Sequence, residues 1–255
     1  MSLRITPLKA FTDNYIWAIH NHQHCYVVDP GQSEPVSRFI TEQRLTLSGI
    51  LITHHHHDHV GGLEALQKQH KAPAWGPDDD RITGDCQVVS EGEELQLPAL
   101  NTSLQVLFVP GHTVSHIVFY NNDWLFSGDT LFSLGCGRMF EGNPEMFVKS
   151  LAKIKALPDY LSVYCGHEYT RANARFALAV EPDSEAIRDY CQQIDQLRAE
   201  HKPSLPSRLG TEKKLNPFLR TDDKQFQQQV QSRCNQTITN SVDCFAALRQ
   251  WKDDF

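Results

Sequence analysis

The segment ILITHHHHDHVGG (50–62) holds the densest group of metal-binding side chains in the sequence. His54 and His56 are two residues apart, so on an extended segment both imidazole rings project from the same face. Asp58 and His59 follow where this predicted strand ends and two glycines turn the chain towards a helix. Imidazole nitrogen and carboxylate oxygen are ligands that suit zinc, iron and manganese. The segment therefore predicts a metal site.

The two intervening histidines, His55 and His57, face the other way in this interpretation and are not expected to be ligands. Three less specific interpretations compete with a metal site. A histidine run can be an affinity tag, but tags sit at termini. It can also be a tract that buffers loosely held metal, or a set of histidines that only pack in a core. The apolar strand before the run and the glycine turn after it favour a built site.

Three further motifs each place a polar residue at the end of a predicted strand: VPGHT with His112, FSGDT with Asp129 and YCGHEYT with His167. Together with the first four residues they supply seven donors, which is more than one tetrahedral ion accepts, so two ions are predicted. Three ligands for each ion and one shared carboxylate account for all seven. Two ions about 3.5–4 Å apart hold a water whose pKa falls from 15.7 to about 7, so the predicted chemistry is hydrolysis of an activated carbonyl or a phosphoester.

Short β-branched and aromatic runs, separated by turn residues and helical patterns, are expected to position these motifs. Helices are predicted over 34–44, after Gly61–Gly62, and across 147–157. The acidic run 78–80 is expected to form a solvated loop. This alternation predicts an α/β fold, with sheets covered by helices. The expected strands are LRITPL, YIWAIH, CYVVDPG, SGILITH, LQVLFVP, HIVFYNN, WLFSGD and LSVYCGH.

The character of the chain changes after residue 169, because strand-like runs give way to amphipathic helical patterns. We therefore expect two domains, a catalytic domain over 1–169 and a helical domain over 170–255. Pro203, Pro206 and Gly210 are expected to mark a loop inside the helical domain.

Composition is that of an ordinary globular protein, with 255 residues, 40% of them hydrophobic and 22% charged. The net charge of −7 divides into −8 for residues 1–169 and +1 for 170–255, which disfavours a nucleic-acid-binding protein. No apolar run is long enough for a membrane span and the start does not resemble a signal peptide, so a cytoplasmic location is expected. Seven cysteines without a CxxC spacing predict reduced thiols.

The motifs THHHHDH, GHT, GDT and GHEYT, in this order and spacing, resemble those of the metallo-β-lactamase superfamily. Within it the chain is similar to the glyoxalase II (hydroxyacylglutathione hydrolase) family over essentially its whole length, including CGRMFEG, NPFLR and the terminal LRQWKDDF. The resemblance implies an αβ/βα sandwich of two mixed sheets with outer helices. It also implies that the small C-terminal helical domain helps to bind glutathione.

The resemblance implies a role for each of the seven donors. One ion would be held by His54, His56 and His112, the other by Asp58, His59 and His167, with Asp129 bridging them. Asp58 would also be the catalytic residue that orients the bridging hydroxide. The implied cofactors are two divalent ions, zinc foremost, with iron and manganese also compatible.

The resemblance also implies the residues that contact glutathione: Arg138, Phe140, Tyr169, Arg249 and Lys252. Two of these positions depart from many family members, which have lysine where Arg138 stands and tyrosine where Phe140 stands. A lysine contact thereby becomes a guanidinium contact, and a phenol hydrogen bond is lost.

The implied reaction is hydrolysis of S-D-lactoylglutathione, or a related 2-hydroxyacylglutathione, to D-lactate and glutathione in methylglyoxal detoxification. Glutathione leaves as a thiolate, and a thiol with a pKa near 8.5 departs without a dedicated acid. The expected partner is this small molecule, with no nucleic acid and no membrane, and a monomer is expected. Three alternatives stay open: a β-lactamase of the same superfamily, a nuclease of the same fold, and a non-catalytic metal-storage or structural protein.

Overall fold

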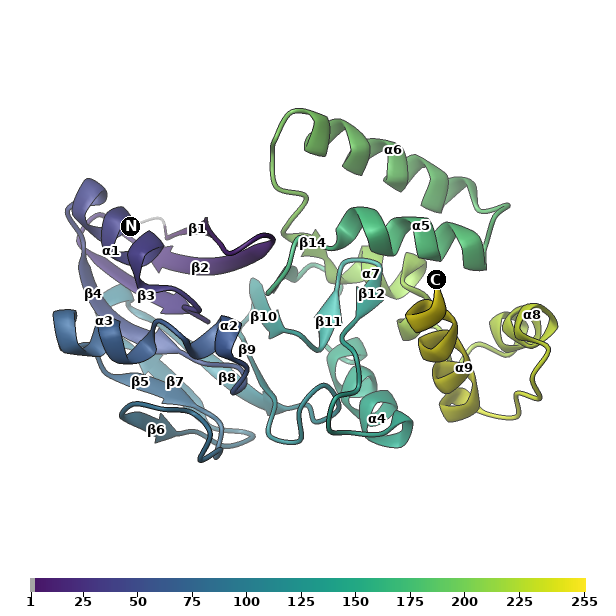
Figure 1. The fold of residues 1–255 in the computed structure, drawn as a ribbon, viewed down its shortest axis with the longest axis horizontal. Helices are drawn as coiled ribbons and strands as arrows, with labels where there is room; N and C mark the ends of the chain where they lie inside the picture. Colours follow the sequence, from purple (N-terminus) through teal and green to yellow (C-terminus); the bar gives the residue numbers. More distant parts are fainter. Residues whose placement is uncertain (1–2) are drawn as a thin grey trace. The chain divides into compact units, whose positions relative to one another are not determined.

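Two units make up the chain in this computed structural model, which describes residues 3–255 (Figure 1). The first unit comprises Met1–Phe108 and Ser115–Gly128, and the second comprises Val109–Val114 and Asp129–Phe255. The backbone therefore passes from one unit to the other three times. The expected boundary between residues 169 and 170 stays a prediction.

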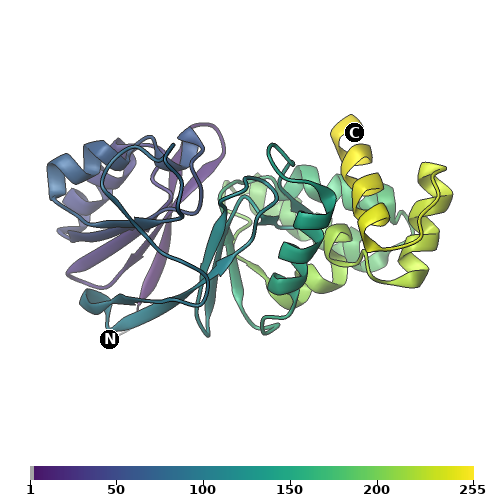
Figure 2. The same cartoon turned by 90° about the horizontal axis from the view of Figure 1, so that it is seen from below.

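The first sheet of the first unit contains six strands in the order in which the chain makes them. Tight turns join the first three strands, which pair antiparallel, and the longer connections through α1 (Ser33–Gln43) and α3 (Leu63–His70) bring in parallel neighbours. These two helices lie side by side on the sheet and bury residues such as Val36 and Leu66 against it (Figure 2). The strands are β1 (Arg4–Ala10), β2 (Asn14–His20), β3 (His24–Val28), β4 (Thr46–Leu51), β5 (Ala74–Gly76) and β6 (Cys86–Val88).

The second sheet of the first unit is antiparallel. Its strands β7 (Glu94–Leu97), β8 (Thr102–Phe108), β9 (Ile117–Tyr120) and β10 (Trp124–Gly128) pair in this order. The short helix η1 (Pro98–Leu100) precedes β8, and its Ala99 carbonyl accepts a 3.2 Å hydrogen bond from the Asn21 side chain in the β2–β3 turn. The two sheets of this unit are thereby joined at one end.

The second unit is mostly helical. Its strands form two short pairs, β11 (Leu131–Phe132) with β12 (Gly135–Cys136) and β13 (Ser162–Cys165) with β14 (Ser207–Arg208). In both views α9 runs beside α4 and α8 (Figures 1 and 2). The helices are α4 (Pro144–Lys155), α5 (Thr170–Val180), α6 (Glu185–Ala199), α7 (Leu209–Leu215), η2 (Pro217–Leu219), α8 (Lys224–Cys234) and α9 (Ser241–Asp254).

A chain of buried aromatic rings holds α9 in the second unit. The Phe245 ring stacks on Phe147 of α4 at 5.2 Å and meets Phe218 of η2 edge-on at 5.6 Å. The Phe218 ring in turn stacks on Phe176 of α5 at 6.1 Å. Such ring pairs contribute about 0.5–1.5 kcal/mol each beyond the area they bury, so α9 is packed as part of the core.

The predicted α/β class and the helical C-terminal region are confirmed, while two local expectations are wrong. Strand β4 ends at Leu51, so His54 and His56 lie in a loop, and α2 (His57–Val60) begins directly after it. Gly210 lies within α7 and not in a loop, and a Cβ there would lie 3.0 Å from the Asp159 Cβ, which explains the glycine. Among residues 3–255, no helix combines the length and apolar character that crossing a bilayer requires.

Candidate active site

The loop between β4 and α2 aims two ring nitrogens at one point. His54 is fully buried, and its Nε2 lies 3.1 Å from Nδ1 of His56. The Thr53 hydroxyl donates to a carboxylate oxygen of Asp29 (2.8 Å), so its own oxygen accepts from Nδ1 of His54 (3.0 Å). This pairing fixes the His54 tautomer and leaves Nε2 as the nitrogen with metal-binding capacity.

A second pair of donors lies on α2. Nε2 of His59 is 3.4 Å from Oδ2 of Asp58, and Nδ1 of His59 donates to Asp29 Oδ2 (3.0 Å). The Asn14 side chain, at the start of β2, donates to the same Asp58 oxygen (2.9 Å). Asp29 and Asn14 therefore hold the donors in place, and the sequence interpretation missed both. Asp29 ends the run CYVVD, so the rule that found His112 and Asp129 could have found it.

Three donors gather in the second unit. Oδ2 of Asp129 lies 3.2 Å from Nε2 of His167 and 3.6 Å from Nε2 of His112. Nδ1 of His112 donates to the Arg138 carbonyl (2.8 Å). A Cβ on Gly137 would lie 2.0 Å from the Asp129 carbonyl oxygen and 2.9 Å from Nδ1 of His112, so only glycine allows this approach.

The donor spacings fit metal ligation. With metal–ligand bonds of 2.0–2.1 Å, two ligands of one tetrahedral ion are about 3.3 Å apart. The four donor pairs are separated by 3.1, 3.4, 3.2 and 3.6 Å. Within each unit, the histidines and aspartates predicted from the sequence as metal ligands therefore lie at the distances expected for ligands of one ion.

His116, next to the metal motifs in sequence, also lies in this part of the first unit. Its fully buried ring stacks on His54, with centroids 4.6 Å apart and planes 18° from parallel. Gly128 makes room for it, since a Cβ there would lie 2.8 Å from the His116 ring and 2.5 Å from the Thr53 hydroxyl. With φ of 48°, Gly128 also adopts a backbone conformation that other residues rarely take.

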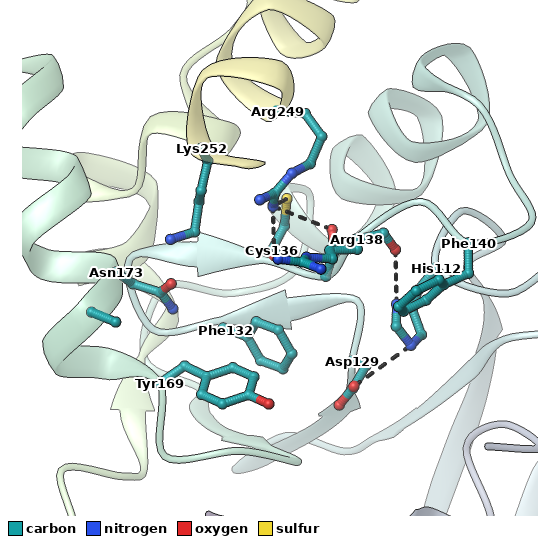
Figure 3. Close-up of a pocket in the computed structure, with 12 residues that line it drawn as sticks. His112, Asp129, Phe132, Cys136, Arg138, Phe140, Tyr169, Asn173, Arg249 and Lys252 are labelled. Atoms are coloured by element: carbon teal, nitrogen blue, oxygen red, sulfur yellow. Dashed lines mark hydrogen bonds and ion pairs between the residues drawn. The ribbon is translucent and has the colours of Figure 1, made fainter. Parts of the chain in front are cut away.

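A cavity of about 460 Å³ lies in the second unit, with Asp129 and His112 on its wall (Figure 3). All five residues expected to bind glutathione line it. In Figure 3, Lys252 and Arg249 descend from α9, and the Tyr169 ring lies below them. The lining comprises His112, Asp129, Phe132, Cys136, Gly137, Arg138, Phe140, Tyr169, Ala172, Asn173, Arg249 and Lys252.

Arg249 binds the protein itself. The side chain is buried, and its Nη1 donates to the carbonyls of Cys136 (3.1 Å) and Gly137 (3.5 Å). Its Nη2 donates to Asp253 (2.8 Å), which also lies 3.5 Å from Nε of Arg138. Arg249 therefore anchors the pocket wall from α9, in addition to lining the cavity.

Lys252 has a different environment. Burial, together with the nearby Arg249 charge, lowers its pKa to about 8, and its Nζ lies 5.0 Å from the Phe176 ring centroid. The Tyr169 ring stacks flat on His167, with centroids 4.6 Å apart. Phe140 on the wall is 63% exposed. The cavity thus combines cationic groups with aromatic faces.

Buried polar side chains of the helical region grip the β11–β12 turn. Glu212 accepts from the Leu134 backbone N–H (2.7 Å), and Asn216 donates to the carbonyls of Phe132 (3.1 Å) and Gly135 (3.0 Å). Burial raises the Glu212 pKa. The sequence did not predict these hydrogen bonds, because nothing in the run TEKKLNPFLR identifies the distant backbone groups that Glu212 and Asn216 bind.

The fold and the donor set define the class of protein, the metallo-β-lactamase superfamily, whose model matches residues 11–84. ETHE1 from Myxococcus xanthus shares the fold with a TM-score of 0.64, at 23% identity over 99% of this chain and 100% of that one. TTHA1623, solved in a di-iron-bound form, is 25% identical with a TM-score of 0.55, over 64% of this chain and 91% of that one.

The C-terminal region narrows the class. Residues 168–255 match the model described as hydroxyacylglutathione hydrolase C-terminus. A relative from Shewanella halifaxensis named hydroxyacylglutathione hydrolase is 47% identical over 99% of this chain and 100% of its own length. The chain belongs to the hydroxyacylglutathione hydrolase family.

Proposed function

We propose that this protein hydrolyses glutathione thioesters of 2-hydroxy acids, with S-D-lactoylglutathione as the expected substrate, and that it uses two divalent metal ions. The observation that carries the proposal is that pairs of histidine and aspartate donor atoms lie at the spacing of metal ligands. Two of these pairs include Asp129, which also lines the cavity that contains Arg138, Arg249 and Lys252. The relative described above is named for this activity.

The metal part of the proposal assigns all seven donors. His54, His56 and His112 would hold one ion, Asp58, His59 and His167 the other, with Asp129 shared. The di-iron form of the TTHA1623 protein supports a count of two, and the nitrogen and oxygen ligands suit zinc, iron and manganese. When bound, the ions supply a water of lowered pKa as the nucleophile and positive charge for the developing oxyanion.

The chain's own residues orient the reaction. Asn14 fixes one Asp58 oxygen, which leaves that carboxylate in a defined position from which to orient the attacking water. Thr53 and Asp29 hold His54 and His59 in the ligating tautomers. The glutathione thiolate departs without a dedicated acid.

The pocket part of the proposal concerns substrate recognition. Lys252 and Arg138 would bind the glutathione carboxylates, and Tyr169 and Phe140 would pack along the peptide. Arg249 would contribute mainly by holding the Cys136 and Gly137 carbonyls. The exposed Phe140 offers an apolar edge where a tyrosine would offer a hydroxyl.

Two broader parts of the proposal follow from sequence. We assign the catalytic part to 1–169 and the substrate-binding part to 170–255. A reducing compartment, the cytoplasm, is supported by seven cysteines that all remain thiols, several of them with a pKa raised by burial.

The test combines metal analysis with turnover of S-D-lactoylglutathione on one purified sample. We expect a metal content approaching two ions per chain, loss of turnover after chelation, and recovery when divalent metal returns. A small thioester without glutathione should be hydrolysed less efficiently. Full turnover by metal-free protein would contradict the mechanism, and metal binding without any thioester turnover would favour a storage role.

A further inference from the structure

Asp79, in the segment between β5 and β6, is a buried carboxylate in an otherwise exposed acidic run. Its side chain is only 3% exposed, whereas Asp78 and Asp80 lie at the surface. The expectation of a solvated loop is therefore wrong at this position. A carboxylate is withdrawn from water only where other groups replace its hydration, so its contacts identify what it holds.

Two partners bind the Asp79 carboxylate directly. The Arg81 guanidinium donates to both oxygens, from Nε to Oδ1 (2.8 Å) and from Nη2 to Oδ2 (2.7 Å). The Ser115 hydroxyl donates to Oδ2 at 2.5 Å. The Arg81 guanidinium holds the pKa of this carboxyl well below its usual range. Asp79 thus joins its own loop to the start of the segment that leads into β9.

The same carboxylate lies beside the predicted metal loop. Its Oδ2 is 3.4 Å from Nδ1 of His55. The His55 ring meets the His56 ring at 4.7 Å and 66°, and the His54 ring at 6.4 Å and 84°. His55 is not an expected ligand, but its ring therefore packs against the rings of both expected ligands, His54 and His56.

A second route leads from Asp79 to the other side of His54. Ser115, which Asp79 holds, precedes His116, whose ring stacks on His54. The His54 ring thus lies between the rings of His55 and His116. The Asp79 carboxylate contacts His55 directly and binds Ser115, the residue before His116.

We propose that Asp79 is a positioning residue for the metal loop. By packing against His55 at 3.4 Å, and by accepting the hydrogen bond from Ser115, which precedes His116, it fixes the direction in which His54 and His56 present their nitrogens. The inference rests on the proposed function only in taking these two histidines as metal ligands. Groups that orient ligands from outside the coordination sphere typically account for 10–100-fold in metal affinity.

The decisive experiment compares three single variants of the full chain, Asp78→Asn, Asp79→Asn and Asp80→Asn. Each variant removes one negative charge, and the three positions are consecutive. Only Asp79→Asn places an amide NH2 group where the Arg81 and Ser115 donors need an acceptor. Zinc affinity of the metal-free proteins, measured by competition with a chromophoric chelator, should fall 10–100-fold for Asp79→Asn and stay at the parent value for the other two.

Two further measurements separate positioning from general support of the fold. The visible spectrum of the cobalt-loaded protein reports ligand geometry and should change for Asp79→Asn alone, while thermal unfolding of the metal-free forms reports the fold. In a double-mutant cycle, Asp79→Asn should cost less zinc affinity in a His55→Ala background than in the parent.

Equal zinc affinity for Asp79→Asn and Asp80→Asn would overturn the inference, as would a full effect of Asp79→Asn in the absence of the His55 ring. If Asp79→Asn unfolds too readily to assay, Ser115→Ala takes its place, and an unchanged zinc affinity and cobalt spectrum would equally overturn it. A parent protein that binds no zinc or cobalt would instead refute the proposed function.

Discussion

At the scale of single residues, the two cations of α9 have separate tasks. The Arg249 guanidinium donates to backbone carbonyls and to Asp253. Among residues 3–255 the Lys252 ammonium makes no such hydrogen bond, and its pKa is lowered to about 8. A lysine with this pKa carries its charge below pH 8 and loses it as the pH rises through that value. Recognition of a carboxylate by Lys252, as proposed, would therefore depend on pH.

We expect KM for S-D-lactoylglutathione to rise above pH 8, because the Lys252 charge that we propose binds a carboxylate is lost there. A charged hydrogen bond is worth about 1.5–3 kcal/mol, so Lys252→Ala should raise KM roughly tenfold to a hundredfold below pH 8 and remove the pH step. Steady-state kinetics from pH 6 to 10 would measure this. Lys252→Arg should keep the low KM across the range, and an unchanged KM in Lys252→Ala would show that the residue does not read the substrate.

Sequence alone could predict the residues of the site but only part of their surroundings. His54 and Asp129 follow from motifs, because the capacity to bind metal is a property of the residue itself, whereas Lys252 follows only from the family resemblance. The burial of Asp79 and the grip of Asn216 could not be predicted, because each depends on partners 36 and more than 80 residues away. The short strands β5 and β6 and the helix α7 were missed for the same reason, since neighbouring elements stabilise them more than local propensity does.

At the scale of elements, the β11–β12 hairpin connects the predicted metal ligand Asp129 to the rest of the cavity wall. Asp129 precedes it, Phe132 and Cys136 lie within it, and Arg138 follows it. The turn at its tip contains Leu134 with φ of 54°, a conformation that needs support from outside the hairpin. Glu212 and Asn216 supply that support.

Asn216→Ala should therefore weaken both the fold and substrate binding. It leaves the buried carbonyls of Phe132 and Gly135 without their side-chain donor, and each such loss costs about 1–3 kcal/mol, so the free energy of unfolding should fall by roughly 2 kcal/mol or more. Urea unfolding measures the first effect and KM the second. Lys214→Ala, on the exposed face of α7, is the matched control and should change neither. A parent-like KM in Asn216→Ala would mean that the hairpin keeps its position without this support.

At the scale of the whole molecule, four of the proposed ligands belong to the first unit and three to the second. If both ions are shared as proposed, metal binding stabilises the two units together. Binding at a hundredfold excess over Kd adds about 2.7 kcal/mol for each ion, which corresponds to roughly 5–10 °C in Tm. Calorimetry of the metal-free and zinc-loaded protein should show this rise in a single transition. A rise confined to one of two separate transitions would contradict shared ligation.

The threefold passage of the backbone between the units has a consequence for how the chain is made. Strand β8 ends at Phe108, and its antiparallel partner β9 begins at Ile117, after an excursion into the second unit that contains His112. During synthesis β8, which already pairs with β7 on one side, is therefore complete before β9 exists, and a strand edge without its neighbour is a template for association with other chains. A truncated chain ending at Phe108 should therefore aggregate more than one ending at Gly128, in which Val106 can pair with Phe119, in a sedimentation assay. Equal aggregation of both would show that β9 does not protect this edge.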